Sequence, residues 1–405
     1  RWIVGEANRM SPEAPVPVLL ETNQEFSIGG AGNLALNIKS LGSEVELTSV
    51  AGNDKEGFKL LELIEASKLD VIMAQDHSVT TTKTRLVGQR GQHIVRWDRE
   101  EQYVGTVAKR FNNHVKKHDI ICISDYAKGT VKRDTIGKLL GKDAKILVDP
   151  KQDANFYHGA YLVKPNMQEY EAWFGNFDVE IAKKRCADNE WTWLIVTDGA
   201  NGIHVVTKDT YDHIKSKTVE VADVSGAGDS VLAIIAHYFQ NSKMMNCCEL
   251  AVKGAEKIVQ KRGVSIIDRS DVEDTVVWTN GVFDILHEGH FKLLKFAKQQ
   301  GDQLIVGINS DESVKRLKGE NRPFNNSFVR EQQLLQLPWV DKVVVFNEDT
   351  PIEAIKKYEP NIIVKGGDYT FDTVVGNDLA EVRIFPTVKG FSTTNIVDTV
   401  NGNKN

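Results

Sequence analysis

The sequence predicts an α/β protein with two domains. Its 405 residues exceed what one ordinary hydrophobic core accommodates. Short β-branched runs alternate with helical stretches almost throughout, a pattern typical of helices layered on mostly parallel sheets. The alternation starts again after Gly263, which indicates a second domain.

Apolar runs predict the strands of the first domain. Four of them have the length of buried strands, at residues 45–50, 119–124, 145–149 and 194–197. Residues 80–86 and 93–97 predict a β-hairpin, because Gly88 and Gly91 lie in the turn between them. We expect this hairpin to form a β lid over a pocket.

A polar segment marks the boundary between the domains. Residues 268–274 are acidic and lack apolar periodicity, and an apolar strand at 276–278 follows at once. We therefore expect a first domain at residues 1–267, a linker at 268–275 and a second domain at 276–405.

The composition argues against several classes of protein. A charged share of 26% beside 41% hydrophobic residues is typical of soluble globular proteins. No apolar run approaches the ~20 residues of a membrane-spanning helix. The first residues do not have the pattern of a secretory signal, so we expect a cytoplasmic protein. A net charge of -6 gives no reason to expect nucleic acid or a membrane as partner.

The four cysteines fit neither a disulfide framework nor a zinc site. They form no Cys-x-x-Cys pair, and two of them are adjacent: Cys122, Cys186, Cys247 and Cys248. We expect buried free thiols.

A glycine-rich loop indicates a first phosphate site. Residues 223–229, Asp-Val-Ser-Gly-Ala-Gly-Asp, precede an apolar helical run at 231–235. Glycines at a helix start let backbone N–H groups converge, and the helix dipole adds positive potential, so the loop can hold a phosphoryl group. Asp229 is placed to accept the proton of an attacking hydroxyl. The alternative is a glycine turn that only caps a helix.

Two further segments favour the functional interpretation. Gly29 and Gly30 open a predicted helix at 34–41, and the Asn33 amide can bond sugar hydroxyls. Asn166 and Glu169 follow a strand and are suited to ordering a metal-bound phosphate.

In this order the three segments resemble the ribokinase, or PfkB, family of carbohydrate kinases over roughly residues 1–263. The resemblance implies a ribokinase-like three-layer domain that uses ATP and Mg²⁺, with the metal close to Asn166 and Glu169. It implies an anion hole and base at Gly226, Ala227, Gly228 and Asp229. It implies a nucleotide-binding strand and turn at Thr197, Asp198, Gly199 and Gly202.

This sequence departs from the family pattern at one point. Family kinases begin with an extra strand whose following loop carries an acidic sugar-binding residue, and this chain starts after that strand. We expect a gap in the sheet and one missing sugar contact, which makes kinase activity less secure than membership of the fold.

Residues 9–18 and 124–129 carry a closer resemblance, to the kinase half of the bifunctional enzymes that make ADP-heptose. It implies substrate contacts from Gly29, Gly30, Asn33, Asp125 and Lys128. For the sugar's 7-phosphate the basic candidates are Lys83, Arg85 and Arg96 on the predicted lid, although a solvated β-surface explains them equally.

A histidine pair indicates a second phosphate site. Residues 279–290 follow the strand at 276–278 and open a helix that runs to Gln300. His287 and His290 are three residues apart, so both imidazoles can face one phosphate at a helix N-terminus. Nucleotidyl transfer needs hydrogen bonds to the α-phosphate as charge accumulates there. The alternatives are two structural histidines, or a zinc site, for which no third His or Cys is nearby.

Basic and helix-starting groups accompany this pair downstream. Lys318, Arg322 and Arg330 can neutralise a triphosphate. Ser392, Thr393 and Thr394 begin the last predicted helix, and Gly366 and Asp368 follow the strand at 362–364. For each of these groups taken alone, a solvated loop is the alternative.

Residues 275–400 resemble the cytidylyltransferase-like nucleotidyltransferases. The resemblance implies a Rossmann-like fold, magnesium ATP and direct in-line attack. It also implies nucleotide contacts from these further positions: Asn280, Gly281, Phe283, Asp284 and Gly289.

Together the halves resemble bifunctional heptose 7-phosphate kinase and heptose 1-phosphate adenylyltransferase enzymes. We expect ATP and heptose phosphates as ligands and a homodimer formed through the first domain. Two alternatives stay open: a nucleotidyltransferase for another sugar or alcohol phosphate, or for CTP, and a first domain that serves only as a scaffold.

Overall fold

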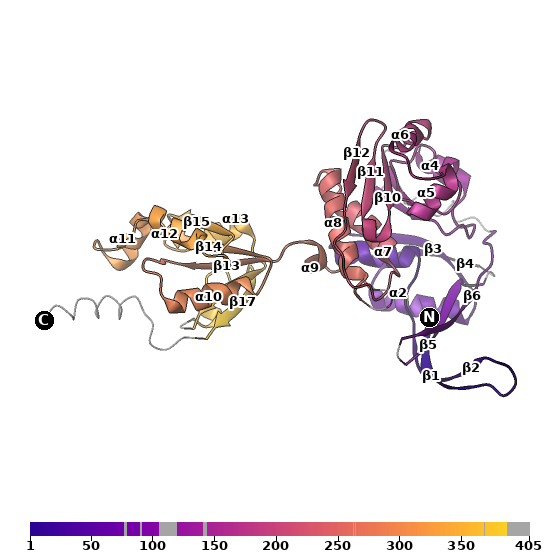
Figure 1. Ribbon diagram of the computed structural model, residues 1–405, viewed down its shortest axis with the longest axis horizontal. Coiled ribbons are helices and arrows are strands. Elements are labelled where there is room, and N and C mark those ends of the chain that lie inside the picture. The colour runs from indigo at the N-terminus through magenta and orange to yellow at the C-terminus, as the bar shows by residue number, and fades with distance from the viewer. Residues whose placement is uncertain are drawn as a thin grey trace. The chain divides into compact units, whose positions relative to one another are not determined.

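A computed structural model (Figure 1) describes residues 1–76, 79–89, 91–104, 120–140, 144–261, 263, 265–367 and 369–386. The chain divides into two units, Arg1–Val272 and Glu273–Asn405. Each unit has its own sheet and its own hydrophobic core.

A six-stranded sheet forms the centre of the first unit, in the order β12-β11-β10-β9-β8-β7. Four of its strands are parallel: β7 (Ile120–Ser124), β8 (Lys145–Asp149), β9 (Leu162–Val163) and β10 (Trp193–Thr197). The antiparallel strands β11 (Ile203–Val206) and β12 (Tyr211–Ile214) complete it. Asp119, at the start of one predicted strand, lies outside the described residues.

Helices cover both faces of this sheet, because its strands are apolar on both faces. Leu147 and Ile195 point to the layer of α1 (Ala31–Ser40), α7 (Ala227–Tyr238) and α8 (Met244–Ile258). Val148 and Val196 point to the opposite layer, of α4 (Arg133–Leu140), α5 (Met167–Phe174) and α6 (Val179–Asp188). Figure 1 shows the sheet between the two layers. The expected ribokinase-like three-layer fold is therefore present.

The predicted hairpin is half of a larger sheet. Its strands are β5 (Thr82–Gly88) and β6 (His93–Arg99), which pair antiparallel. Strand β1 (Trp2–Met10) pairs with β5 in parallel and with β2 (Pro17–Glu25) in antiparallel orientation. The sheet order β2-β1-β5-β6 brings together segments about eighty residues apart, which local sequence patterns do not reveal.

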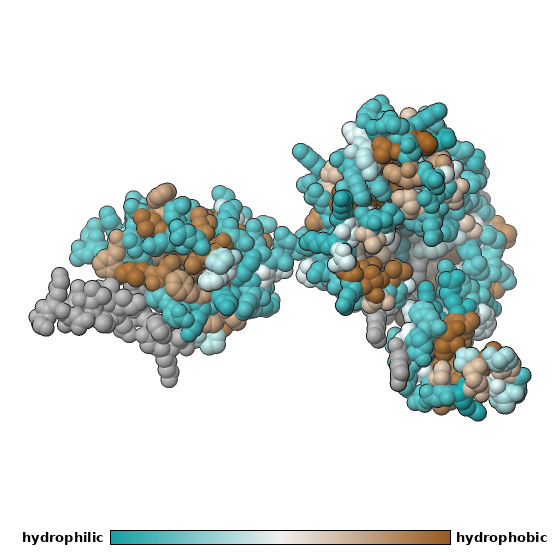
Figure 2. All heavy atoms as spheres, viewed as in Figure 1, coloured by the Kyte–Doolittle hydropathy of each residue, from teal (hydrophilic) through white to brown (hydrophobic). Residues whose placement is uncertain are grey.

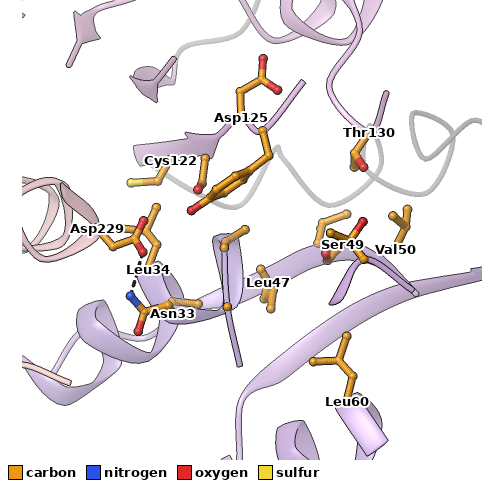
Figure 3. A pocket seen from close by; sticks show the side chains of 18 of the residues that line it. Asn33, Leu34, Leu47, Ser49, Val50, Leu60, Cys122, Asp125, Thr130 and Asp229 are labelled. Carbon is orange, nitrogen blue, oxygen red and sulfur yellow. Dashed lines mark hydrogen bonds between the residues drawn. The ribbon is translucent and has the colours of Figure 1, made fainter. Parts of the chain in front are cut away.

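A separate two-stranded parallel sheet lies beside these elements. It consists of β3 (Glu46–Gly52) and β4 (Asp70–Asp76), connected through α2 (Lys55–Ser67). In the described part of the chain no ladder joins β3 to β7. Strand β3 lines a cavity of about 960 Å³ that extends to the Asn33 and Asp229 side chains (Figure 3).

The junction between the units is partly structured. A short helix, α9 (Arg269–Val272), occupies the first half of the segment that we expected to be a linker, and the units divide between Val272 and Glu273. Val272 is fully buried against the core that contains α8. One apolar residue in a polar run is too weak a signal to reveal such an anchor from sequence.

The second unit contains a five-stranded parallel sheet in the order β15-β14-β13-β16-β17. Its strands are β13 (Val276–Gly281), β14 (Gln303–Asn309), β15 (Lys342–Phe346), β16 (Ile362–Gly366) and β17 (Glu381–Phe385). Helices α10 (Glu288–Lys298) and α12 (Ser327–Leu335) pack on one face, and α13 (Ile352–Tyr358) packs on the other. Helix α11 (Asp311–Lys318) follows β14.

The strand order of this sheet reverses between β13 and β16. From β13 the chain adds β14 and β15 on one side, and it then returns to add β16 and β17 on the other. In open α/β sheets such a reversal opens a crevice at the carboxyl ends of the strands, where ligands bind. This arrangement is the expected Rossmann-like fold.

Two general expectations concern the whole chain. The cysteines are free thiols, three of them buried and Cys122 partly buried. Within the described ranges, none of the helices combines the length and the apolar character that a membrane crossing requires.

Candidate functional sites

The first site centres on Asp229, in the first turn of α7. Asp229 is 8% exposed, and the Asn33 Nδ2 of α1 donates to its Oδ2 at 2.7 Å. Figure 3 shows the two side chains pointing toward one another from separate helices. Burial raises the pKa of Asp229 to about 6, and the Asn33 hydrogen bond opposes this rise. The carboxylate is therefore ionised at neutral pH and basic enough to accept a proton.

The loop before Asp229 has free amide donors. Gly226 has φ 86°, a conformation that favours glycine, and it caps α7. The N–H groups of Gly228 and Asp229 donate to no protein acceptor within the described residues. They lie at the positive end of the helix dipole, as an anion hole requires.

Lys164 is a member of this site that sequence reasoning did not assign. Its side chain is 3% exposed, and its Nζ lies 3.1 Å from Asp149 Oδ1. A Cβ atom on Gly228 would lie 3.5 Å from the same Nζ, so the ammonium group is adjacent to the glycine loop. Asp149 ends β8, and Lys164 directly follows the neighbouring strand β9. A lysine directly after a buried strand was the available signal.

Asn166 and Glu169 form the capping box of α5. Asn166 Oδ1 accepts from Glu169 N at 2.9 Å, and Glu169 Oε2 accepts from Asn166 N at 3.0 Å. Glu169 Oε1 also pairs with Lys151 Nζ at 2.9 Å. One partly paired carboxylate suits a Mg²⁺ ion that is held mainly by substrate phosphates and water. The residues present thus fit the indirect metal contact that we expected of Glu169.

The predicted nucleotide turn lies at the same edge of the sheet. Thr197 ends β10 and forms a β-bridge with Asn166. Asp198 N donates to Gly202 O at 2.8 Å, with Gly199 between them. Gly202 has φ 100°, and a Cβ there would lie 2.0 Å from Ile214 O, so only glycine fits this turn.

The predicted sugar contacts have different roles. Gly29, Gly30 and Lys128 line the cavity, and Lys128 pairs with Glu100 at 2.5 Å. The Asp125 carboxylate accepts from Tyr157 Oη and from Gln152 Nε2, both at 2.7 Å.

Asp125 Oδ1 also accepts from Ala127 N at 2.8 Å. Both oxygens are bonded within the protein, so Asp125 orders the loop after β7, and the residue also lines the cavity. The direct substrate contact that we expected of Asp125 stays a prediction.

Two of the three basic residues on the lid reach the cavity. Lys83 and Arg85 line it, and their cationic groups lie over the rings of Tyr126, at 5.8 Å, and Trp2, at 5.0 Å. Arg96 Nε instead pairs with Asp98 Oδ1 at 3.1 Å.

The second site centres on stacked imidazoles at the start of α10. The ring centroids of His287 and His290 are 3.8 Å apart, and the Phe283 ring lies 5.0 Å from that of His290. Burial lowers the pKa of His290 to about 4, with smaller contributions from His287 and Lys318. Burial also lowers the pKa of His287. Both rings are therefore neutral at pH 7, and each can donate one N–H to a phosphate.

The loop between β13 and this pair is tightly held. Phe283 has φ 48°, in the left-handed region that non-glycine residues rarely adopt, and it is 3% exposed. The Asp284 carboxylate accepts from the N–H groups of Phe324 and Asn325, both at 2.9 Å, and pairs with Arg322 Nη2 at 2.9 Å. Asp284 therefore joins two loops, in place of the nucleotide contact that we expected.

Arg330 does not lie where a nucleotide can reach it. Its exposed fraction is 0%, and it donates to Asn325 O at 3.0 Å, Val282 O at 2.8 Å and Asp311 Oδ1 at 2.7 Å. All of its nitrogens serve protein acceptors. We therefore assign it a positioning role, in place of the expected neutralisation of a triphosphate.

The other predicted residues of this site divide into three groups. Asn280 and Gly281 end β13, Gly366 ends β16 and Gly289 lies in the first turn of α10, so all four are at the carboxyl edge of the sheet or beside it. Lys318 ends α11 and is exposed. The remaining predicted residues, Asp368, Ser392, Thr393 and Thr394, lie outside the described residues.

Metal-ligating groups are sparse. Among the residues that the structure describes, no three His, Cys, Asp or Glu side chains gather closely enough to hold a metal ion. The stacked histidines thus have no third ligand of these types in that part of the chain.

Family models match each unit separately. The model described as pfkB family carbohydrate kinase matches residues 3–270, and the one described as cytidylyltransferase-like matches residues 278–401.

Solved structures resemble the first unit. Phosphofructokinase-2 from Escherichia coli matches with a TM-score of 0.58 at 18% identity, covering 67% of this chain and 92% of its own. Ribokinase from Thermotoga maritima matches with a TM-score of 0.54 at 18% identity, covering 67% of this chain and 94% of its own. At this identity the likeness concerns the fold alone.

Curated relatives match both units at once. The bifunctional protein HldE of a Nitratiruptor species is 36% identical, over 98% of this chain and 96% of the relative. The bifunctional protein HldE of Haemophilus influenzae (strain PittEE) is 36% identical, over 99% of this chain and 94% of the relative. With a carbohydrate-kinase fold in one unit and a nucleotidyltransferase fold in the other, the chain belongs to the HldE family of bifunctional enzymes.

Proposed function

We propose that this enzyme phosphorylates D-glycero-β-D-manno-heptose 7-phosphate at O1 and later couples the 1-phosphate to AMP, forming ADP-heptose for lipopolysaccharide synthesis. One observation carries the proposal. Each unit has its own reactive group at the start of a helix, Asp229 at α7 and the stacked His287 and His290 at α10. Two separate phosphate sites in one chain match two consecutive reactions of a phosphorylated sugar.

In the kinase step the anomeric hydroxyl attacks the γ-phosphorus of ATP and ADP leaves. Asp229 accepts the hydroxyl proton, and Asn33 fixes the orientation of its carboxylate. The N–H groups of Gly228 and Asp229 hold the transferred phosphoryl group, and the Lys164 ammonium beside them adds positive charge.

Mg²⁺ and the lid complete this site in our proposal. Bound Mg²⁺ would neutralise phosphate charge, and Glu169 would hold it indirectly. Lys83 and Arg85, which line the cavity, bind the sugar's 7-phosphate. Thr197, Asp198, Gly199 and Gly202 form the nucleotide side of the site.

A separate phosphatase then removes the 7-phosphate. In the adenylyl step an oxygen of heptose 1-phosphate attacks the α-phosphorus of ATP and pyrophosphate leaves, so no covalent enzyme intermediate is needed. The neutral His287 and His290 rings donate hydrogen bonds to the α-phosphate as its charge grows. Lys318 and Arg322 contact the leaving pyrophosphate.

We also propose a homodimer in the cytoplasm, formed through the four-stranded sheet of the first unit. Its strands and the β1–β2 turn expose large apolar side chains: Met10, Val16, Leu20, Val95 and Trp97. Figure 2 shows hydrophobic residues gathered over this sheet, on a surface that is otherwise mostly hydrophilic. Such patches are typical of subunit interfaces. ATP and sugar phosphates are charged metabolites, which supports the cytoplasmic location.

Single-site variants of the full chain test the two activities. Asp229→Asn should lower heptose 7-phosphate phosphorylation by roughly 10²–10⁴-fold, the usual contribution of a general base. His290→Ala should lower pyrophosphate release from ATP and heptose 1-phosphate by roughly 10²–10³-fold. Each variant should keep the other activity, which shows that the loss is confined to one unit, and an unchanged melting temperature is the folding control for the mutated unit.

Two outcomes would count against the proposal. Wild-type protein without kinase turnover would favour a scaffold role for the first unit. Pyrophosphate release with CTP and not with ATP would reject the adenylyl assignment.

A further inference from the structure

Lys365 is a buried cation in the second unit. It lies on β16 and is 6% exposed. Its Nζ donates to Asn280 O at 3.1 Å and lies 5.0 Å from the centre of the Tyr369 ring. An ammonium group has three N–H donors, and only one of them has an acceptor among the described residues.

No carboxylate of the described residues pairs with Lys365. Two arginines of the same unit differ in this respect, because Arg322 pairs with Asp284 and Arg330 pairs with Asp311. Burial lowers the pKa of Lys365 to about 8, because an ammonium group kept from water, with no carboxylate of the described residues beside it, favours its neutral form. A buried charge of this kind costs free energy until an anion meets it.

The position of Lys365 is that of a ligand group. The bond from Lys365 to Asn280 O joins β16 to β13, the two strands between which the sheet order reverses. Both residues are at the carboxyl ends of their strands. Crevices at such points bind ligands in open α/β sheets. The loop that continues from Asn280 leads to His287 and His290, so the cation and the imidazoles belong to the same edge.

We propose that Lys365 binds a phosphate group of a substrate in the nucleotidyl-transfer site. Its two remaining N–H donors and its charge meet phosphate oxygens, and the Asn280 carbonyl orients the ammonium toward them. This inference deepens the proposed function and rests on it. ATP and heptose 1-phosphate both have phosphate groups that could contact Lys365, and the test below distinguishes between these two substrates.

Calorimetric titration of the full-length enzyme provides that test. ATP, heptose 1-phosphate and inorganic phosphate are titrated separately into wild type, Lys365→Met, Lys365→Arg and the control Lys356→Met. Lys356 is an exposed lysine of the same unit that pairs with Glu353. Lys365→Met should weaken the phosphate ligand that Lys365 contacts by roughly 10- to 100-fold. Lys365→Arg should recover part of the loss, and Lys356→Met should bind as wild type does.

Proton uptake gives a readout that needs no variant. An anion favours the charged form of lysine, so binding raises the pKa of Lys365 from about 8 and takes up a proton between pH 8 and 10. At about pH 9 the terminal phosphates of ATP and heptose 1-phosphate are fully ionised, since their last pKa is ≈ 6, and inorganic phosphate is present as its dianion. His287 and His290 are neutral there. Titrations in buffers of different ionisation enthalpy should show an uptake approaching one proton per site, which Lys365→Arg removes.

The separate titrations with the three ligands show which phosphate group Lys365 contacts. Uptake with ATP alone assigns Lys365 to the nucleotide, and uptake with heptose 1-phosphate alone assigns it to the attacking phosphate. Uptake with inorganic phosphate but with neither substrate keeps the phosphate site and rejects the proposed substrates. Binding without proton uptake in wild type, together with unchanged affinity in Lys365→Met, would overturn the inference.

Discussion

The basicity of Asp229 depends on its burial and on the side chains around it, Asn33 first among them. Burial raises its pKa to about 6, and the hydrogen bond from Asn33 is the main group that lowers it. Replacing Asn33 with Ala should therefore raise this pKa further. The acid limb of the kinase pH profile reports the base in the free enzyme, so it should move from about pH 6 toward higher pH.

Kinase kcat/KM measured between pH 5 and 9 checks this prediction. The rate at pH 7 should fall more than the rate at pH 9, because a base with a higher pKa is protonated over a wider range. Adenylyl transfer should keep its pH profile in the same variant. An acid limb that stays in place would show that Asn33 does not tune the base.

Arg330 was predicted from the sequence as a phosphate contact, and the structure assigns it a positioning role. A basic residue in a predicted nucleotide site suggests a phosphate contact. In the structure its guanidinium is enclosed and satisfies Val282 O, Asn325 O and Asp311. Burial and hydrogen-bond partners follow from the assembled fold, and neither is encoded in the residue type.

Replacement of Arg330 by Met should destabilise the second unit by about 3 kcal/mol, because three acceptors lose their donors. Arg316→Met is the matched control, since the exposed pair that Arg316 makes with Asp349 is worth at most ~1 kcal/mol. Calorimetric melting of both variants measures the difference. Equal melting temperatures would contradict the positioning role of Arg330.

At the scale of elements, local patterns identified strands well. The β-branched runs at 145–149 and 194–197 correspond to β8 and β10, because a strand buried on both faces must be apolar at every position. The hairpin was also found, since its turn is local. Its partner strand β1 was not, because pairing across about eighty residues leaves no local trace.

The docking of α2 on β3 depends on a glycine. A Cβ on Gly57, in the first turn of α2, would lie 2.1 Å from the backbone oxygen of Gly52 at the end of β3. Gly57→Ala should therefore destabilise the first unit by about 1–3 kcal/mol, since the helix must move away from the strand.

A second helical glycine supplies the control. Gly137 in α4 has no heavy atom within 4 Å of its Cβ position. Gly137→Ala should stabilise the unit by about 0.4–1 kcal/mol, because alanine loses less backbone entropy on folding. Urea unfolding of the two variants should give shifts of opposite sign. Shifts of the same sign would show that α2 is not held against β3.

At the scale of the whole molecule, the two sites belong to two separately built units. Each has its own sheet and core, and the chain divides between Val272 and Glu273. If the proposed function holds, the kinase product must leave the enzyme to lose its 7-phosphate before the second step. No direct transfer between the sites is then required.

An equimolar mixture of Asp229→Asn and His290→Ala proteins should therefore produce ADP-heptose as fast as wild type, at equal concentrations of each working site and with the phosphatase present. Product formation followed by chromatography measures this rate. Either variant alone should produce almost none. A mixture that is much slower than wild type would show that the two sites of one chain must cooperate.

The order of amino acids was enough to predict the fold classes, the succession of the two units and the residues that can do chemistry. Glycine loops, histidine spacing and strand periodicity are local properties, which can be read along the chain. The assembled fold was needed to show which candidates are buried, which are already bonded and which meet. Asn33 reaches Asp229 across 196 positions, and Lys365 reaches Asn280 across 85. Such contacts depend on how strands and helices pack, and packing is a property of the whole chain.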